Sequence, residues 1–285
     1  MTLQYWYMFP VSLVVATVAM ASGVEGATFF APIFILGLGL PPEIAIGTGL
    51  ITEVFGFASG LYAYARKKLI DYRLGATLLL VTIPLALVGT WASGRVEPDI
   101  LKVILGVGLF AVAISFLRAP DHTEVRLLDT KIKEDFSEKN AETCLVTATG
   151  EEIRYTVCNK SEGMLISGVG GLFIGLISTG LGEMNSYFLL QRCRVPSRVS
   201  VATSVLVVAV TALVAAGGHL IQFVQSGSET MQIVSNLVIF TVPGVVIGGQ
   251  MGSLVSSRIS QKVLERSMGV LFILVAAFTL GEVLL

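Results

Sequence analysis

The sequence predicts an all-α integral membrane protein built from two inverted-topology repeats of about four hydrophobic segments each. Its composition predicts the class, because 54% of the 285 residues are hydrophobic and 14% are charged, whereas a soluble domain carries roughly 25% charged residues. Apolar runs of about 20 residues are therefore interpreted as spanning helices. Motifs that recur in both halves predict the repeats, and the placement of basic residues predicts that the second repeat is inverted.

The first half begins with a broken segment. The segment at 24–40 is too short or too interrupted to form an independent span, so we join it to the preceding segment at 4–22 as one broken or re-entrant unit with its irregular part at 23–40. Such backbone is tolerated at membrane depth only where protein or a water-filled cavity surrounds it. Three further spans are expected, at 44–65, 73–93 and 99–117.

A polar stretch at 119–163 separates the two halves, and it predicts a small cytoplasmic β-hairpin loop. Strand-forming residues occupy Glu142–Thr149 and Ile153–Lys160 around a turn at 150–152. In this pairing Cys144 faces Cys158. A reducing cytosol would keep the two thiols reduced, and a redox-regulatory disulfide is the alternative.

The second half repeats the order of the first. A broken or re-entrant unit is expected at 164–191, followed by three spans at 199–221, 233–252 and 264–285. The predicted division is a first transmembrane repeat at 1–118, the connecting loop at 119–163 and a second transmembrane repeat at 164–285.

Matching motifs support this duplication. Pro41 to Thr48 aligns with Pro196 to Thr203 at an offset of 155 residues, and Pro84 and Gly89 align with Pro243 and Gly248. Blocks that recur in the same order, prolines included, favour an internal repeat in a transporter-like protein over chance similarity of apolar sequence.

The basic residues indicate that the repeats are inverted. In the first half they crowd the loop from Arg66 to Arg73, which the positive-inside rule assigns to the cytoplasm. The equivalent loop of the second half, 222–232, has no Lys or Arg, and basic residues instead follow the second broken unit, at 192–198. Equivalent loops with opposite charge bias are expected when the repeats have opposite orientation.

Each broken unit carries a glycine-rich stretch with one acid, Gly23 to Thr28 and Gly180 to Asn185. A helix that restarts there directs free backbone N–H groups and a partial positive charge into a cavity, which suits an anion. Hydroxyl and amide groups nearby supply further donors, although close helix packing is the alternative role of the small residues. The residues expected to bind substrate are Gly23, Gly26, Ala27, Thr28, Thr48, Gly180, Gly182, Asn185, Thr203 and Ser204.

Three acids within the apolar segments are expected to couple proton movement, namely Glu25, Glu183 and Glu53. An acid at membrane depth costs about 2.5–3.5 kcal/mol on insertion scales, so it marks a functional site unless it serves to hold the break in shape. His219 lies near the end of a span and is expected at the membrane interface.

No enzymatic signature is present, so neither catalytic residues nor a cofactor is expected. The chain has no His-Glu-x-x-His motif and no Walker loop. Its three cysteines lack the spacing of a metal site, and the net charge of −1 argues against a nucleic-acid partner. The expected partners are a small anion and the lipid bilayer, with a homo-oligomer left open.

In its two glycine-rich stretches and the motifs that follow them, the chain resembles the TauE/SafE family of sulfite exporter (TSUP-type) permeases. The resemblance rests on two motifs of the first half, Gly23 to Ile33, which includes Pro32, and Ala45-Ile46-Gly47-Thr48-Gly49. Their second-half versions are Gly180 to Met184 and Val201 to Ser204. The resemblance covers both hydrophobic halves but not the 119–163 loop.

The resemblance implies a secondary transporter for export or uptake of small sulfur-containing anions such as sulfite or organosulfonates, and we favour export. It also implies a multi-pass protein of the cell (inner) membrane. Glu25 and Glu183 stand where the family pattern usually has glycine. The alternatives are therefore a cation channel or a carrier coupled to Na⁺ or a metal ion, and a membrane sensor that acts through the 119–163 loop.

Overall fold

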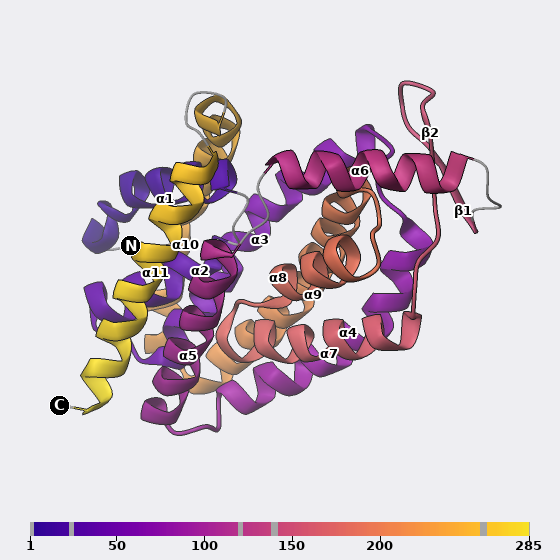
Figure 1. The fold of residues 1–285 in the computed structure, drawn as a ribbon. Helices are drawn as coiled ribbons and strands as arrows, with labels where there is room; N and C mark the ends of the chain where they lie inside the picture. The colour runs from indigo at the N-terminus through magenta and orange to yellow at the C-terminus, as the bar shows by residue number, and fades with distance from the viewer. Residues whose placement is uncertain (1–2, 23–25, 119–121, 138–141, 257–260, 285) are drawn as a thin grey trace.

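The computed structural model describes residues 3–22, 26–118, 122–137, 142–256 and 261–284, and it is an assembly of helices with one small hairpin (Figure 1). Seven helices are long and apolar enough to cross a membrane. The predicted class of an all-α, multi-pass membrane protein is therefore confirmed. The spanning helices are α3, α4, α5, α7, α9, α10 and α11.

The first broken unit consists of α1 (Met8–Ser22) and α2 (Ala27–Pro32), after a short 3-10 turn at Leu3–Tyr5. The helix α2 continues without interruption into a π-helical turn, η2 (Ile33–Gly37). Three long helices complete the first half, namely α3 (Pro42–Arg66), α4 (Tyr72–Ser93) and α5 (Pro98–Leu117). Pro42 and Pro98 stand in the first turns of their helices, where the missing proline N–H costs nothing.

The second half repeats this order. It contains α7 (Lys160–Ile177), α8 (Leu181–Ser186), a π-helical turn η3 (Tyr187–Arg192), α9 (Ser197–Ser226), α10 (Ser228–Ser256) and α11 (Gln261–Leu284). As in the first half, a short α-helix follows the break and passes directly into a π-helical turn. The second unit enters and leaves at the same face, as predicted, because Glu162 at its start forms an ion pair with Arg192 at its end, at 2.8 Å.

Equivalent helices of the two halves run in opposite directions. Gly47 of α3 lies against His219 of α9, whereas Gly60 lies against Val205, which places the two helices antiparallel. In the same way, Gly106 of α5 lies against Leu280 of α11, and Gly269 lies against Leu117. Inverted repeats require these directions, and the duplication itself stays a prediction.

Glycine seams hold the helix pairs α4–α7 and α1–α10 in very close contact. A Cβ atom added to Gly89 would collide with the backbone carbonyl of Leu172, and one added to Gly248 would collide with that of Leu13. Small residues permit such approach between membrane helices. Gly89 and Gly248 are the two positions that the sequence alignment paired.

The helices form two packing cores that mix the two halves. One core contains α1, α2, α5, α10 and α11, and we name it core A. The other contains α4, α7, α8 and α9 together with the hairpin, and we name it core B. Helices α3 and α7 contribute to both cores, with Ile46 and Ile177 in core A and Leu50 and Ile174 in core B. Figure 1 shows the two groups side by side, with both chain ends beside core A.

The described basic residues gather at one end of the helices, which we call the basic face. The end of α3, the starts of α4, α7 and α9, and helix α6 carry them, whereas Arg95 and Lys102 lie toward the opposite end. This distribution assigns the basic face to the cytoplasm by the positive-inside rule.

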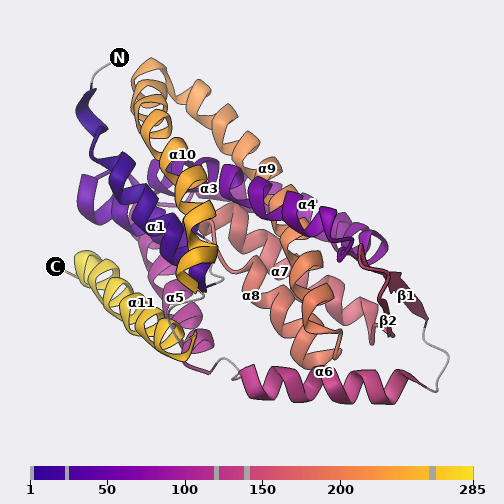
Figure 2. The ribbon, with the colours of Figure 1, turned by 90° about the horizontal axis from the view of Figure 1, so that it is seen from above.

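The connecting loop is more structured than predicted. It contains a helix that the sequence analysis missed, α6 (His122–Ser137), and a hairpin of β1 (Thr143–Val146) and β2 (Glu152–Tyr155). The strands are shorter than expected. In Figure 2, α6 lies outside the bundle of spanning helices, along its edge, with the hairpin beyond its end.

The expected facing of Cys144 and Cys158 is wrong. The register pairs Cys144 with Arg154, and the free thiol of Cys144 is exposed. Cys158 instead forms a disulfide with Cys193, which follows the second broken unit. The prediction failed because it placed the turn at residues 150–152, whereas the strands pair Val146 with Glu152 around residues 147–151, and β2 ends at Tyr155. The chain beyond Tyr155 turns toward the membrane helices.

Candidate functional site

The first break brings an acid of α3 against the start of α2. Gly23 and Glu25 lie outside the described residues, and the description resumes at Gly26, the N-cap of α2. A Cβ atom built on Gly26 would lie 3.5 Å from Glu53 Oε1, and Glu53 is 4% exposed. Ala27 is the first residue of α2. The carboxyl group of Glu53 is therefore buried at the first break.

The second break is a sharp turn of three residues between α7 and α8. Ser178 ends α7 in the left-handed conformation (φ 60°), and Gly180 begins α8 at φ 104°, which favours glycine. The Ser178 hydroxyl donates a hydrogen bond of 2.9 Å to the carbonyl of Ile46 in α3. The break is thereby fixed to the other half of the chain.

The two breaks meet at buried threonines. Thr28 Oγ1 of α2 and Thr179 Oγ1 of the second break are hydrogen-bonded at 2.8 Å, and both side chains are buried. The sequence analysis named Thr28 but not Thr179. Thr179 could have been found as a hydroxyl residue directly before Gly180.

Glu183 lies in the first turn of α8, directly after the break. Its carboxyl oxygen Oε2 is buried and has no hydrogen-bond partner among the described residues. Glu183 also lines an elongated apolar groove of about 730 Å³ between α5 and the α7–α8 turn, together with Thr179 and Gly180.

Two more residues that were predicted to bind substrate are buried, and one polar side-chain atom of each has no hydrogen-bond partner among the residues that the structure describes. Asn185 Oδ1 accepts a 2.6 Å hydrogen bond from Ser167 of α7, while Asn185 Nδ2 has no partner within the described part of the chain. Thr48 is fully buried, and its Oγ1 likewise lacks a partner there. Gly182 stands in the first turn of α8. Within the described ranges, the unpartnered atoms of this group are therefore Asn185 Nδ2 and Thr48 Oγ1.

Thr203 and Ser204 are buried but lie toward the basic end of α9, apart from the breaks. Thr203 Oγ1 accepts a hydrogen bond of 3.1 Å from the backbone N–H of Asp71, at the start of α4. Ser204 is 5% exposed. No hydrogen bond recorded among the described residues joins either side chain to Thr28, Thr179 or Glu183. Their substrate-binding role stays a prediction.

His219 belongs to the interior and not to the membrane interface, so the sequence expectation was wrong. Helix α9 continues to Ser226, which places His219 about two turns inside it. The imidazole is fully buried, and its Nε2 lies 3.0 Å from the carbonyl of Gly175, near the second break. Its Nδ1 has no partner among the described residues. The apolar stretch after Gly217 and Gly218 was misjudged as the end of the span.

Two threonine pairs connect helices of opposite halves around the breaks. Thr52 of α3 is hydrogen-bonded to Thr241 of α10 at 2.9 Å, and Thr82 of α4 is bonded to Thr211 of α9 at the same distance. Because α3 corresponds to α9 and α4 to α10, the two bonds occupy matching places. They satisfy hydroxyls that would be costly to bury alone.

A second cavity, of about 640 Å³, opens on the basic face beneath α6. Lys67 and Arg198 line it together with Tyr64, Thr147 and Ser197. Arg198 is paired with Glu151 of the hairpin turn at 2.8 Å, and Asp129 of α6 accepts a hydrogen bond from the backbone N–H of Ser197. The described residues contain no cluster of three or more His, Cys, Asp or Glu residues that could hold a metal ion.

Comparison with known proteins supplies a family and several relatives. The sequence pattern of the "Sulfite exporter TauE/SafE" family matches residues 8–279. Two relatives from Bacillus subtilis (strain 168) are named probable membrane transporter proteins. YunE is 23% identical over 85% of this chain and 82% of its own, and YjnA is 29% identical over 83% and 86%. No solved structure matches the chain.

Proposed function

The chain belongs to the sulfite exporter TauE/SafE family, and from this membership we propose that it exports small sulfur-containing anions such as sulfite or organosulfonates. It is a multi-pass membrane protein similar to probable membrane transporters. In this proposal transport is secondary, coupled to protons, and involves no catalytic step and no cofactor. The anion binds between the two broken units in the middle of the membrane.

The contact between the two breaks is the observation that carries this proposal. Thr28 and Thr179 join them directly, and a helix begins at each, over 27–37 and over 181–192. Neither N-cap, Gly26 nor Gly180, offers a side chain to the free backbone N–H groups. Two such helix starts close to each other suit an anion without a buried Lys or Arg. Broken helices in corresponding positions of two halves are where transporters bind substrate.

Unsatisfied polar atoms support the same location. Thr48 Oγ1 and Asn185 Nδ2 are buried in fully enclosed side chains and lack partners among the described residues. A buried polar group without a hydrogen bond costs about 1–3 kcal/mol. A bound oxyanion within reach of either group would accept its hydrogen bond and recover that part of the cost.

Proton coupling is assigned to the acids at the breaks. Glu183 lines the groove beside Thr179, and Glu53 lies against Gly26. Glu25, which is outside the described residues, completes the proposed set. In the protonated form such an acid donates to the anion, and release of the proton repels it. Substrate and proton would then move together or in exchange.

Alternating access would move core A against core B and not residues 1–118 against 164–285. The close α4–α7 and α1–α10 seams each join a helix of one half to a helix of the other. A glycine packed on a carbonyl leaves no room for sliding. Helix α3, which contributes to both cores, and the two breaks lie where the moving bodies meet.

Uptake of sulfite into proteoliposomes under an imposed pH gradient tests the proposal, with Glu183→Gln as the variant. Wild-type uptake should depend on the gradient, and in the variant this dependence should fall by at least about tenfold, the ratio that 1.4 kcal/mol represents. Glu229→Gln, at an exposed site in the first turn of α10, is the matched control and should behave as wild type.

Unchanged rate and pH dependence in both Glu25→Gln and Glu183→Gln would refute the coupling. Gradient-independent currents far above carrier turnover, or a requirement for Na⁺, would replace this proposal with the channel or cation-coupled alternative.

A further inference from the structure

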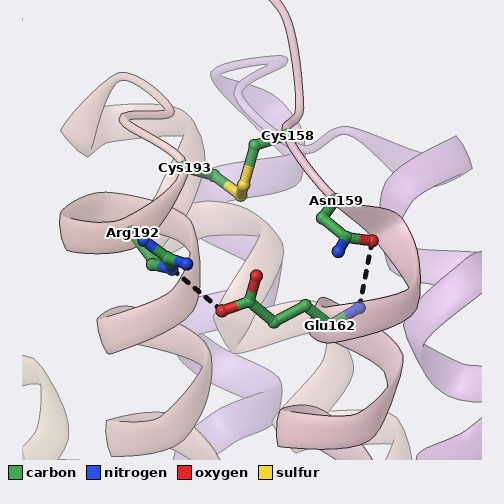
Figure 3. The surroundings of a disulfide bond; sticks show 5 residues. All are labelled: Cys158, Asn159, Glu162, Arg192 and Cys193. Carbon is green, nitrogen blue, oxygen red and sulfur yellow. Dashed lines mark hydrogen bonds and ion pairs between the residues drawn. A yellow bond between two sulfur atoms is a disulfide. The ribbon is translucent and has the colours of Figure 1, made fainter.

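The disulfide joins the two legs of the second broken unit at the basic face (Figure 3). Cys158 lies just before α7, the leg that enters the membrane, and Cys193 directly follows η3, the leg that leaves it. Their Cα atoms are 5.1 Å apart, within the usual range for a disulfide. The ion pair between Glu162 and Arg192 connects the same two legs one turn deeper.

This crosslink restrains a local movement within core B, that of the α8–η3 leg relative to α7, in the part of the chain that carries the candidate site. Helix α8, with Glu183 and Asn185, passes without interruption into η3 and ends at Cys193. Any movement of that leg away from α7 must stretch or break the bond. The first broken unit has no such crosslink, because the three cysteines of the chain are Cys144, Cys158 and Cys193.

The location of the bond indicates that it is reactive. The basic face is the cytoplasmic one by the positive-inside rule. In the cytosol thiols are kept reduced, and the disulfides that do form there are mostly transient or redox-sensing. A bond at this place is therefore open to attack by the sulfur nucleophiles of the cytosol.

The two cysteines of the disulfide differ in their exposure to solvent. Cys158 is exposed, whereas Cys193 is 7% exposed and packs within core B. Exposed basic side chains, Lys160, Arg192 and Arg194, flank the two cysteines in the chain. They favour the approach of an anionic nucleophile and stabilise a thiolate that leaves.

We propose that Cys158–Cys193 is a covalent site for anionic sulfur nucleophiles, whose attack at Cys158 frees the second broken unit to move. The nucleophile's sulfur forms a new S–S bond with Cys158 Sγ, the Cys158–Cys193 bond breaks, and its electron pair leaves on Cys193 as a thiolate. A dithiol then completes the reduction with its second thiol and releases Cys158. Sulfite instead remains on Cys158 as an S-sulfonate. The effect on transport rests on the proposed function.

Thiol counting on purified protein tests the chemistry without any transport assay. After mild oxidation, alkylation and mass measurement should find one reactive thiol, Cys144. Dithiothreitol should expose all three cysteines. Sulfite should expose Cys144 and Cys193 and add one sulfonate group to Cys158. Three free thiols after oxidation would overturn the proposal, and a sulfonate-free protein after sulfite would restrict the nucleophile to thiols.

Transport measured on the same preparations tests whether opening of the disulfide raises the transport rate. Oxidised wild type should take up sulfite at least about fivefold more slowly than reduced wild type, the lower end of coupling between two sites. Cys158→Ser and Cys193→Ser should run at the reduced rate and ignore oxidant, while Cys144→Ser, the matched control, should respond as wild type. An equal response to oxidant in wild type and Cys158→Ser would overturn the switch. If no sample transports sulfite while the thiol counts are as expected, the proposed function fails and the covalent site stands.

Discussion

At the scale of single residues, Asp71 shows how one buried carboxylate holds together two distant parts of the chain. Its Oδ1 caps α4 by accepting hydrogen bonds from the backbone N–H groups of Arg73 and Leu74, at 3.0 and 2.9 Å. Its Oδ2 accepts a 2.7 Å hydrogen bond from the hydroxyl of Tyr155, the last residue of β2. The loop between the repeats is thereby anchored to the start of a spanning helix.

Replacing Tyr155 with Phe should lower stability by about 1–2 kcal/mol, because a buried carboxylate oxygen loses its donor. Burial, with a contribution from the Asp71 hydrogen bond, raises the pKa of Tyr155 above the ordinary value of about 10. The raised pKa means that the anchor is fully present below about pH 10 and is lost as the pH rises further. Thermal unfolding of wild type and Tyr155→Phe should therefore differ at neutral pH and converge in strong alkali. Tyr72→Phe, at an exposed neighbour of Asp71, should show no difference at any pH.

At the scale of elements, the α4–α7 seam decides how rigidly the two halves are joined. Gly89 packs against the carbonyl of Leu172, and Gly175 on the facing helix packs against the carbonyl of Ala86. The two helices thus interlock from both sides. This is why we assign both of them to a single moving body.

Gly89→Ala should destabilise the protein by about 1–3 kcal/mol, because the added methyl group must push α7 away. Gly217→Ala is the control, since a Cβ atom there would meet nothing within 4 Å. In that helix interior alanine should be neutral or stabilise by up to about 1 kcal/mol. Unfolding in a graded denaturing detergent would measure both. Equal stability of the two variants would contradict the close seam.

The elements that sequence reasoning found are those marked by interruption of an apolar run. Both breaks were found because glycine and an acid stand out within hydrophobic segments, and α3 and α9 because proline precedes each. Helix α6 was missed because its composition is polar and mixed. Its apolar residues Val125, Leu128 and Ile132 nevertheless recur at helical spacing and face inward. The Cys158–Cys193 pair depends on where the end of the hairpin meets η3, which no local pattern encodes.

At the scale of the whole molecule, the arrangement couples the cytoplasmic loop to the transport machinery. The hairpin is tied to α4 through Asp71, to α9 through Glu151 and Arg198, and the chain that follows it is tied to η3 through the disulfide. All of these ties belong to core B. In the proposed alternating access the loop would therefore move with core B, which carries Glu183, and core A has no equivalent connection among the described residues.

Control of this coupling by cytosolic sulfur compounds requires that the basic face be cytoplasmic. Labelling of cysteines in intact cells can test this orientation. A membrane-impermeant maleimide should not label the exposed native Cys144 of the hairpin. It should label Ser226→Cys, placed in a Cys144→Ser background, because exposed Ser226 lies at the α9–α10 turn on the opposite face. A permeant maleimide should label both proteins.

The inverse pattern would place the disulfide in an oxidising compartment, where it would be a permanent structural link. That result would remove the basis for a redox switch. The predicted pattern would leave the second broken unit under the control of cytosolic sulfur chemistry, on the side from which an exporter collects its substrate.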